Sequence, residues 1–186
     1  MAHPPVVIVD ENDKVIGEMM VGEAWKTGAY HRLVRVIVED RHGRILLQRR
    51  AKHMKLYPGC WGISAAGHVD AGMTYEAAAR QELIEELSLA DGELEELGYY
   101  QTNKTYEGHE INRFNRVFRL RWNYTPELLP PDEVSEVRWF TKEELLDLVD
   151  NHPEHTSDDL RESAEYLREP ENRAAAQPAA AAGAIQ

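Results

Sequence analysis

Short apolar runs bounded by glycine, proline or charged residues recur along the chain, and this pattern predicts β-strands. We expect strands at 6–9, 15–20, 30–39, 44–49, 61–66, 94–105, 111–122 and 134–140. The first two enclose a polar cluster at 11–14, and the next two enclose a turn at 40–43. Each of these pairs therefore predicts an antiparallel hairpin.

Helical patterns are fewer and lie mainly in the second half of the chain. We expect helices at 74–87, 141–149 and 157–167. The first is rich in alanine and glutamate, and Thr74 is suited to cap its first turn. Helical spacing places Leu83, Ile84 and Leu87 on one flank, which is expected to pack against a sheet. The glycine-containing segment 67–72, just before this helix, is predicted to be a loop.

The order of these elements predicts an α+β fold with a mostly β body and helices near its end. A length of 186 residues is ordinary for one domain, so we expect a single domain over 1–168 with the hairpin at 5–20 as an N-terminal extension. From Pro170 the chain becomes rich in alanine without forming an apolar face. The segment 169–186 is therefore predicted to be a disordered tail.

Charge and cysteine content narrow the function classes. Acidic residues number 33 and basic residues 21, which gives a net charge of -12. This balance argues against a protein that binds a nucleic-acid polymer or an anionic membrane through its overall charge. The single cysteine, Cys60, excludes an internal disulfide and is typical of a reducing compartment. With no secretory signal and no apolar stretch of membrane-spanning length in the sequence, we expect a cytoplasmic location.

Three carboxylates form the first chemical pattern. Glu82, Glu85 and Glu86 follow the spacing i, i+3, i+4 on the 74–87 helix, which places them on one face. Like charges at this distance repel, whereas a divalent cation would bind them, and oxygen ligands suit Mg²⁺ or Mn²⁺. Taken alone, the pattern favours a solvated acidic helix face over a metal site.

The same helix belongs to a segment that resembles the Nudix box, G-x5-E-x7-R-E-U-x-E-E-x-G-U, where U is aliphatic. The matching positions are Gly67, Glu82, Leu83, Glu85, Glu86 and Leu89. Segments 45–50, 56–61, 66–69 and 133–140, together with the opening hairpin, look like those of Nudix hydrolases of the isopentenyl-diphosphate-isomerase-like group. The resemblance extends over roughly 5–168. It implies the Nudix fold, in which helices sandwich a mixed β-sheet.

Three positions depart from the box. Met73 stands in place of its glutamate, Gln81 in place of its arginine and Ser88 in place of its second glycine. In the family that glutamate and arginine form an ion pair, and here both partners are replaced together, so no buried charge is left alone. The loss of this pair could weaken metal affinity or slow turnover.

The resemblance implies a metal-dependent hydrolase that cleaves a diphosphate bond in a small substrate, with a nucleoside diphosphate or a derivative favoured. Its implied cofactor is Mg²⁺, with Mn²⁺ as a substitute, held by Glu82, Glu85, Glu86 and the Gly67 carbonyl. The general base is left open. It could be Glu86 or Glu82, or a residue of the region that holds Glu133 and Glu136.

A basic segment at 49–55 precedes the box. Arg50 and Lys55 within it are expected to meet substrate phosphates, although a solvated connection explains the segment equally well. His68, directly after the box glycine, is expected to lie beside the substrate. The expected partner is thus a small phosphorylated molecule, and the pattern leaves the oligomeric state open.

Two other functions compete with hydrolysis. Isopentenyl-diphosphate isomerase uses a cysteine immediately before the box glycine, where this chain has Ala66, and it binds metal through histidines that His31 and His68 match. The glutamate pair that it requires near 111–113 is missing. A non-catalytic nucleotide-binding module is favoured by the three departures from the box. It is opposed by the three retained glutamates, which a pure binder does not need.

Overall fold

The computed structural model describes residues 4–106, 108–127, 129–130 and 132–168. Its strands are β1 Val6–Val9, β2 Val15–Met19, β3 His31–Glu39, β4 Ile45–Arg50, β5 Trp61–Gly62, β6 Ala65–His68, β7 Leu94–Tyr106, β8 His109–Arg121 and β9 Val134–Phe140. Its helices are α1 Val21–Thr27, α2 Tyr75–Leu87, α3 Lys142–Asn151 and α4 Asp158–Arg168, with a 3₁₀ turn at Pro153–His155. The tail expected at 169–186 lies outside the described ranges.

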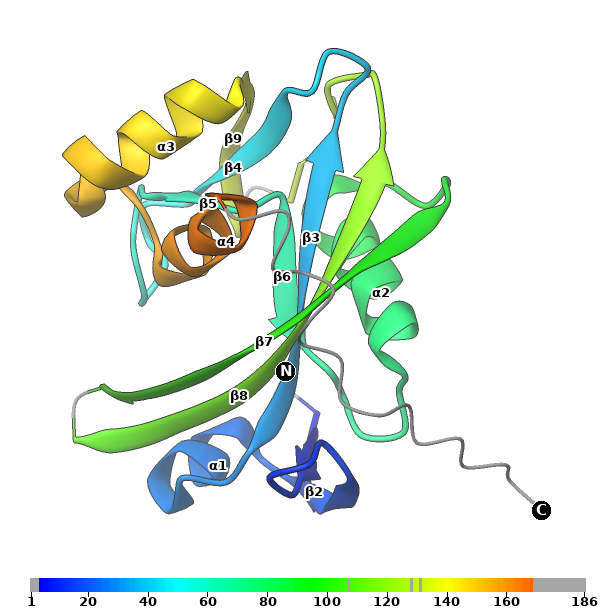
Figure 1. The fold of residues 1–186 in the computed structure, drawn as a ribbon, viewed down its shortest axis with the longest axis vertical. Coiled ribbons are helices and arrows are strands. Elements are labelled where there is room, and N and C mark those ends of the chain that lie inside the picture. Colours follow the sequence, from blue (N-terminus) through cyan, green and yellow to red (C-terminus); the bar gives the residue numbers. More distant parts are fainter. Residues whose placement is uncertain (1–3, 107, 128, 131, 169–186) are drawn as a thin grey trace.

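Strand β3 is the centre of a mixed sheet (Figure 1). It pairs in parallel with β8 from His31↔Arg113 to Glu39↔Arg121, and antiparallel with β6. Strand β8 continues into the long antiparallel hairpin with β7. The opening hairpin of β1 and β2 is confirmed, and Ile8 joins it to His31 of the central strand.

The second expected hairpin, between β3 and β4, is only partly formed. The two strands pair at Glu39↔Ile45 alone. Beyond that point β3 pairs with β6 instead of β4. Strand β4 pairs with β9 from Ile45↔Phe140 to Arg50↔Val134. The two halves of the sheet therefore separate below the turn.

Helices cover both faces of the sheet, as expected for the implied fold. Helix α2 lies on one side of β3, and α3 and α4 lie on the other (Figure 1). Val34, Val36 and Val38 belong to the core beneath α2, whereas Ile37 belongs to the core beneath α3 and α4. A central strand buried on both faces explains why 33–38 is an almost unbroken apolar run. None of the described helices is long and apolar enough to cross a membrane.

Two expectations about local structure are wrong. The strand expected at 61–66 is divided into β5 and β6, and β6 extends through Gly67 and His68, which were expected in a loop. The reason is tertiary, because the edge of β3 extends the ladder through Val34↔Gly67 and Leu33↔His68. Helix α1 was not expected. It has seven residues, of which only Ala24 is buried, so it carries almost no apolar periodicity.

Candidate active site

Helix α2 presents the acidic residues, and its start is fixed as expected. The Thr74 hydroxyl accepts a hydrogen bond from the backbone N–H of Ala77 at 3.2 Å, which caps the first turn. Leu83 and Leu87 are buried against the sheet, but Ile84 is 49% exposed, so the expected apolar flank is wrong at that residue. This rotation of the helix decides which glutamates face inward.

Glu86 faces inward and is buried between α2, β4 and β6. Its Oε2 atom accepts hydrogen bonds from Gln48 Nε2 at 2.8 Å and from the backbone N–H of Ala66 at 3.1 Å. Gln48 is itself buried in β4. The Glu86 carboxylate is therefore held in one orientation by two donors from different strands.

Glu82 also faces inward and packs directly over Gly67. A Cβ atom placed on Gly67 would lie 1.8 Å from Glu82 Oε1 and 2.1 Å from its Cδ. Any side chain at this position of β6 would therefore displace the carboxylate. The box glycine is needed here for space rather than for a special backbone conformation.

The two inward carboxylates disfavour each other's charge. Burial, and then the charges of Glu85 and Glu133, raise the pKa of Glu82 to about 8. Burial, and then the charge of Glu82, raise the pKa of Glu86 well above its ordinary value, which outweighs the lowering by the Ala66 N–H. Such a pair favours either protons or a bound cation.

Glu85 does not join this pair. Its side chain is exposed on the outer surface of α2, and its Oε1 accepts a hydrogen bond from Gln81 at 2.9 Å. Across the part of the chain that the structure describes, no three Asp, Glu, His or Cys side chains are gathered closely enough to hold a metal ion. The expectation that all three box glutamates share one face is thus met by Glu82 and Glu86 only. The carboxylate oxygens of Glu82 and Glu86 are nevertheless ligands that suit a hard divalent cation, and burial disfavours their negative charge, which such a cation would compensate.

The three departures from the box are accommodated without unpaired charge. Met73 packs against the core beneath α2, and Gln81 bonds to Glu85. Ser88 ends the helix with φ 55° and ψ 31°, a left-handed conformation that glycine adopts more readily. The replacements therefore alter packing and backbone strain and leave the inward carboxylates in place.

Glu133 and Glu136, the candidates for a general base outside the box, differ in their surroundings. Glu136 is exposed, and its Oε2 lies 3.4 Å from Nη1 of Arg49 in an ion pair. Glu133 is exposed too, and its charge raises the pKa of both Glu82 and Glu86. Of these two candidates, Glu133 is therefore the one whose charge acts on the inward pair.

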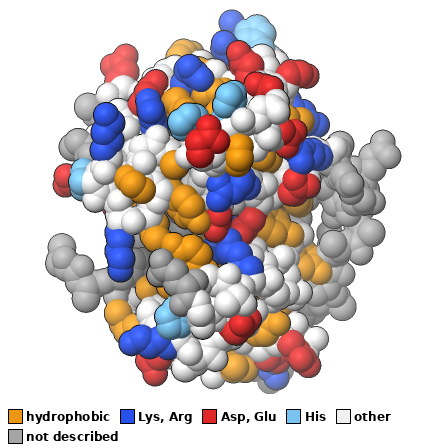
Figure 2. Space-filling view, turned by 90° about the vertical axis from the view of Figure 1, so that its left-hand side faces the viewer, with side chains coloured by type: hydrophobic (Ala, Val, Ile, Leu, Met, Phe, Trp, Pro, Cys, Tyr) orange, Lys and Arg blue, Asp and Glu red, His pale blue; other side chains and the backbone are white. Residues whose placement is uncertain are grey.

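A pocket opens next to the inward carboxylates, between β3, β6, β8 and α4. It is lined by Trp25, Leu33, Arg35, Gln48, Arg50, Leu56, Tyr57, Gly62, Ala66, Gly67, His68, Glu86, Lys104, Tyr106, Ile111, Arg113, Asp158 and Asp159. Figure 2 views the side on which α3 and α4 lie in Figure 1, and there basic, acidic and hydrophobic side chains lie next to one another near the centre. The pocket wall combines apolar and aromatic side chains with seven charged ones, and polar groups set among apolar walls are typical of small-molecule sites.

The expected substrate contacts are only partly placed at this pocket. Arg50 and His68 line it, and Arg50 Nε donates a hydrogen bond to the carbonyl of Leu56 at 3.0 Å. Lys55 is exposed and does not line the pocket. The ring of His68 stacks on that of His31 at 5.4 Å between centroids, and burial lowers the pKa of His31 to about 4.

The sequence did not indicate that Arg35 and Lys104 line this pocket, or that acidic residues of α4 pair with them. Arg35 is almost fully buried, and its Nη2 lies 3.5 Å from Oε2 of Glu162 on α4. Lys104 Nζ contacts Asp158 and Glu162 on the same helix. A charged residue inside the apolar run 33–38 was a usable signal for Arg35, but nothing local pointed to its partner.

Comparison with known proteins agrees with this architecture. The model of the NUDIX domain matches residues 29–160. An uncharacterized Nudix hydrolase from Nostoc is 33% identical over 158 residues, which is 82% of this chain and 89% of the relative. An isopentenyl-diphosphate Delta-isomerase from Nocardia farcinica is 35% identical over 144 residues, 76% of this chain and 81% of the relative.

A solved structure extends the agreement to three dimensions. The crystal structure of DR0079 from Deinococcus radiodurans superimposes with a TM-score of 0.74 at 27% identity, covering 87% of this chain and 98% of that one. The domain match spans most of the chain and includes β3, the box and α2. The chain therefore belongs to the Nudix family and is a Nudix-type hydrolase.

Proposed function

We propose that this protein hydrolyses a diphosphate bond in a small phosphorylated substrate, with Mg²⁺ as its cofactor and a nucleoside diphosphate or a derivative as its substrate. The observation that carries the proposal is the inward pair of Glu82 and Glu86 beside a pocket that also holds basic residues. A divalent cation would relieve the repulsion of this pair and give a diphosphate its binding partner. Mn²⁺ satisfies the same oxygen ligands.

In this proposal Glu82, Glu86 and the Gly67 carbonyl would hold the metal, and Glu85 would join them from the helix surface. A bound ion would neutralise negative charge on the phosphate oxygens and lower the pKa of its water. Gln48 and the Ala66 N–H keep Glu86 oriented through their two hydrogen bonds. Gly67 leaves room for Glu82 to approach the pocket.

Proton transfer falls to a carboxylate outside the buried pair. Glu133 is exposed to solvent and close enough to Glu82 and Glu86 to raise the pKa of both. An exposed carboxylate can take a proton from the attacking water and release it to solvent. Arg50 and His68 contact the substrate from the pocket wall, and Lys55 would need to fold over it from its exposed position.

Isomerisation of isopentenyl diphosphate is the second candidate, because relatives with that name match most of the chain. The residues of the site oppose it. The position before the box glycine is Ala66, while Cys60 lies outside the pocket and its thiol contacts the carbonyl of Glu154 at 3.5 Å. Burial also raises the pKa of the Cys60 thiol, which disfavours the reactive thiolate. At 111–113, where the isomerase requires glutamates, this chain has Ile, Asn and Arg.

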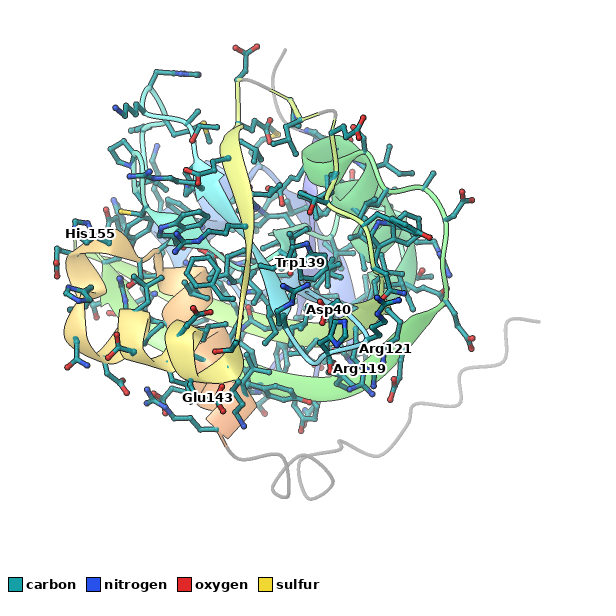
Figure 3. All side chains as sticks on the ribbon, turned by 90° about the horizontal axis from the view of Figure 1, so that it is seen from above. Asp40, Arg119, Arg121, Trp139, Glu143 and His155 are labelled. Atoms are coloured by element: carbon teal, nitrogen blue, oxygen red, sulfur yellow. The ribbon has the colours of Figure 1, made fainter. Side chains whose placement is uncertain are left out.

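The proposal is tested by chromatographic measurement of the nucleotide and phosphorylated products formed from nucleoside diphosphates, nucleoside triphosphates, dinucleotides and nucleotide sugars in the presence of Mg²⁺. We expect turnover of nucleoside diphosphates and a fall of about 10²-fold or more in kcat for Glu86→Gln, as for loss of one electrostatic contact to the transition state. Glu143→Gln is the matched control, since Glu143 lies on the surface of α3 (Figure 3).

Two outcomes would contradict the proposal. One is the absence of turnover for every compound in the panel, and the other is a Glu86→Gln protein that is folded and as active as its parent. Deuterium exchange from water into isopentenyl diphosphate separates the second candidate. Exchange by the parent protein would favour isomerisation over hydrolysis.

A further inference from the structure

Arg113 is a cation in the pocket that forms no ion pair with any residue in the described part of the chain. It lies on β8 directly beside His31 of β3 in the parallel register. It lines the same pocket as Glu86 and Gly67. Its Nε atom is buried and has no hydrogen-bond partner, and its guanidinium forms no ion pair with any residue that the structure describes.

The other cations that line the pocket have partners, and Arg50 Nε donates a hydrogen bond to the carbonyl of Leu56. Arg35 pairs with Glu162, and Lys104 contacts both Glu162 and Asp158. These two carboxylates attract Arg113 only from a distance, because neither forms an ion pair with it. Glu162 and Asp158 are therefore engaged by Arg35 and Lys104, and neither neutralises the charge of Arg113 through an ion pair.

An uncompensated guanidinium costs the free protein stability. Burial and the neighbouring charge of Arg35 lower the pKa of Arg113, which shows that its surroundings disfavour the cation. A methionine would fill similar space without this cost, since replacing buried ionic groups by apolar ones is often neutral or stabilising. A charge held in place against such a penalty indicates a ligand that compensates it.

We infer that Arg113 binds the terminal phosphate of the substrate and thereby selects compounds whose diphosphate ends in a free phosphate. A guanidinium presents a planar fork that matches two oxygens of a phosphate. Among the groups of a diphosphate, the terminal phosphate carries the most charge and the most free oxygens. This inference rests on the proposed function, because it takes the pocket as the place where the diphosphate is bound.

The first test measures binding without catalysis. Thermal unfolding is followed in metal-free buffer with inorganic pyrophosphate, inorganic phosphate or acetate. Pyrophosphate and phosphate are expected to raise the Tm of the parent protein, and the shift is expected to disappear in Arg113→Met. Without ligand, Arg113→Met is expected to unfold at the same temperature as the parent or higher, because it removes an uncompensated buried charge.

Arg119→Met is the matched control for this test. Arg119 lies on the same strand, near Arg121 in Figure 3, and it is paired with Glu95 and Glu39. It does not line the pocket. The control is expected to keep the pyrophosphate shift and to unfold at the same temperature as the parent or lower. A shift that is lost in Arg113→Met but kept in Arg119→Met shows that the anion site, and not merely an arginine on β8, has been removed.

The second test compares substrate classes. Arg113→Met and Arg113→Lys are expected to raise KM about 10- to 100-fold for nucleoside diphosphates, as for loss of one charged hydrogen-bonding contact. KM for nucleotide sugars and dinucleotides, whose phosphates are capped at both ends, is expected to change less than threefold. The kcat values should stay within a few-fold of the parent. Lysine should restore part of the affinity as a point charge without the fork.

Several results would overturn the inference. These are a parent Tm that neither pyrophosphate nor phosphate raises, a pyrophosphate shift that survives in Arg113→Met, a shift produced by acetate alone, and equal changes in KM for free and capped substrates. If Arg113→Met abolishes the pyrophosphate shift but the parent hydrolyses no diphosphate, the proposed function fails while phosphate binding by Arg113 stands.

Discussion

Gly67 has no side chain, and the space that one would occupy holds the carboxylate of Glu82. The atoms that a Cβ would meet belong to the end of that side chain, so Gly67→Ala should move Glu82 and leave β6 intact. A displacement of about 1 Å at a reacting centre costs about 10²-fold in rate. We expect Gly67→Ala to lose that much in kcat/KM with little change in Tm, as measured by steady-state kinetics and thermal unfolding.

Gly17 on β2 is the control for this substitution. A Cβ built there meets no atom within 4 Å, and the residue does not have a positive φ. Gly17→Ala should therefore keep both activity and stability. An active Gly67→Ala protein would show that Glu82 does not need its position over the glycine.

Ser88 is strained in a way that the box glycine would not be. Its left-handed conformation at the end of α2 costs an L-residue about 1 kcal/mol relative to glycine. We expect Ser88→Gly to raise the free energy of unfolding by about 0.5–1 kcal/mol, since glycine also loses more backbone entropy on folding. Urea denaturation measures this change. Ser88→Ala retains the strain and should not be stabilised, whereas a less stable Ser88→Gly would contradict the interpretation.

Helix α4 contacts the sheet through ion pairs as well as through its apolar face. Glu162 accepts from Lys104 Nζ at 2.9 Å and from the Thr102 hydroxyl at 3.2 Å, and it pairs with the buried Arg35. Removing one partner of a buried ion pair costs about 3–5 kcal/mol, because the other charge remains buried. Glu162→Gln is expected to destabilise the protein toward the lower end of that range, as measured by urea denaturation.

Glu165 provides the comparison on the same helix. It is exposed and pairs with Arg168 one turn away. Exposed pairs contribute about 0.2–1 kcal/mol, so Glu165→Gln should change the free energy of unfolding by less than about 1 kcal/mol. Equal effects of the two substitutions would show that burial of Arg35 does not govern the attachment of α4.

Elements that depend on local signals were predictable, and those that depend on packing were not. Thr74 as the cap of α2 and the strands around the turns follow from nearby residues. The spacing of the box glutamates was read correctly, but burial of Leu83 and Leu87 sets the rotation that turns Glu85 outward. No local pattern indicates how far a helix turns on its sheet.

The same reasoning applies to the pocket. Gln48 meets Glu86, and Arg35 meets Glu162, across long stretches of chain, so only the folded arrangement of β4, β3 and α4 reveals these pairs. Arg113 lies on β8, whose sequence has arginines at 113, 116, 119 and 121 without indicating which of them faces the pocket. The Nudix box therefore identified the family, while the places of Arg35 and Arg113 in the pocket required the structure.

At the scale of the whole molecule, the acidic residues behind the net charge of -12 lie in two different environments. Glu95 and Glu96 on β7 are paired with Arg119 and Arg116 and belong to the surface. The inward pair is different, because burial favours its protonated state in the absence of metal. In the proposed function, metal binding to this pair would therefore release protons and would couple metal affinity to pH and to the stability of the fold.

This coupling predicts how stability depends on pH. Glu82 has an ordinary pKa of 4.5 and a pKa of about 8 in the fold, so between these values the folded protein keeps a proton that the unfolded chain releases. Its contribution is complete below about pH 4.5 and is lost as pH rises toward 8. His31, whose pKa falls to about 4 in the fold, has the opposite effect, but that effect is complete above its ordinary value of 6.5.

From pH 6.5 to 8 the metal-free protein should therefore lose stability, by up to about 1.4 kcal/mol per pH unit for each retained proton. Urea denaturation along this pH series should show the loss in the parent, a flatter profile in Glu82→Gln, and a smaller loss when Mg²⁺ is saturating. A metal-free parent whose stability is constant or rises over the same interval would mean that the inward carboxylates are already ionised and compensated in the fold.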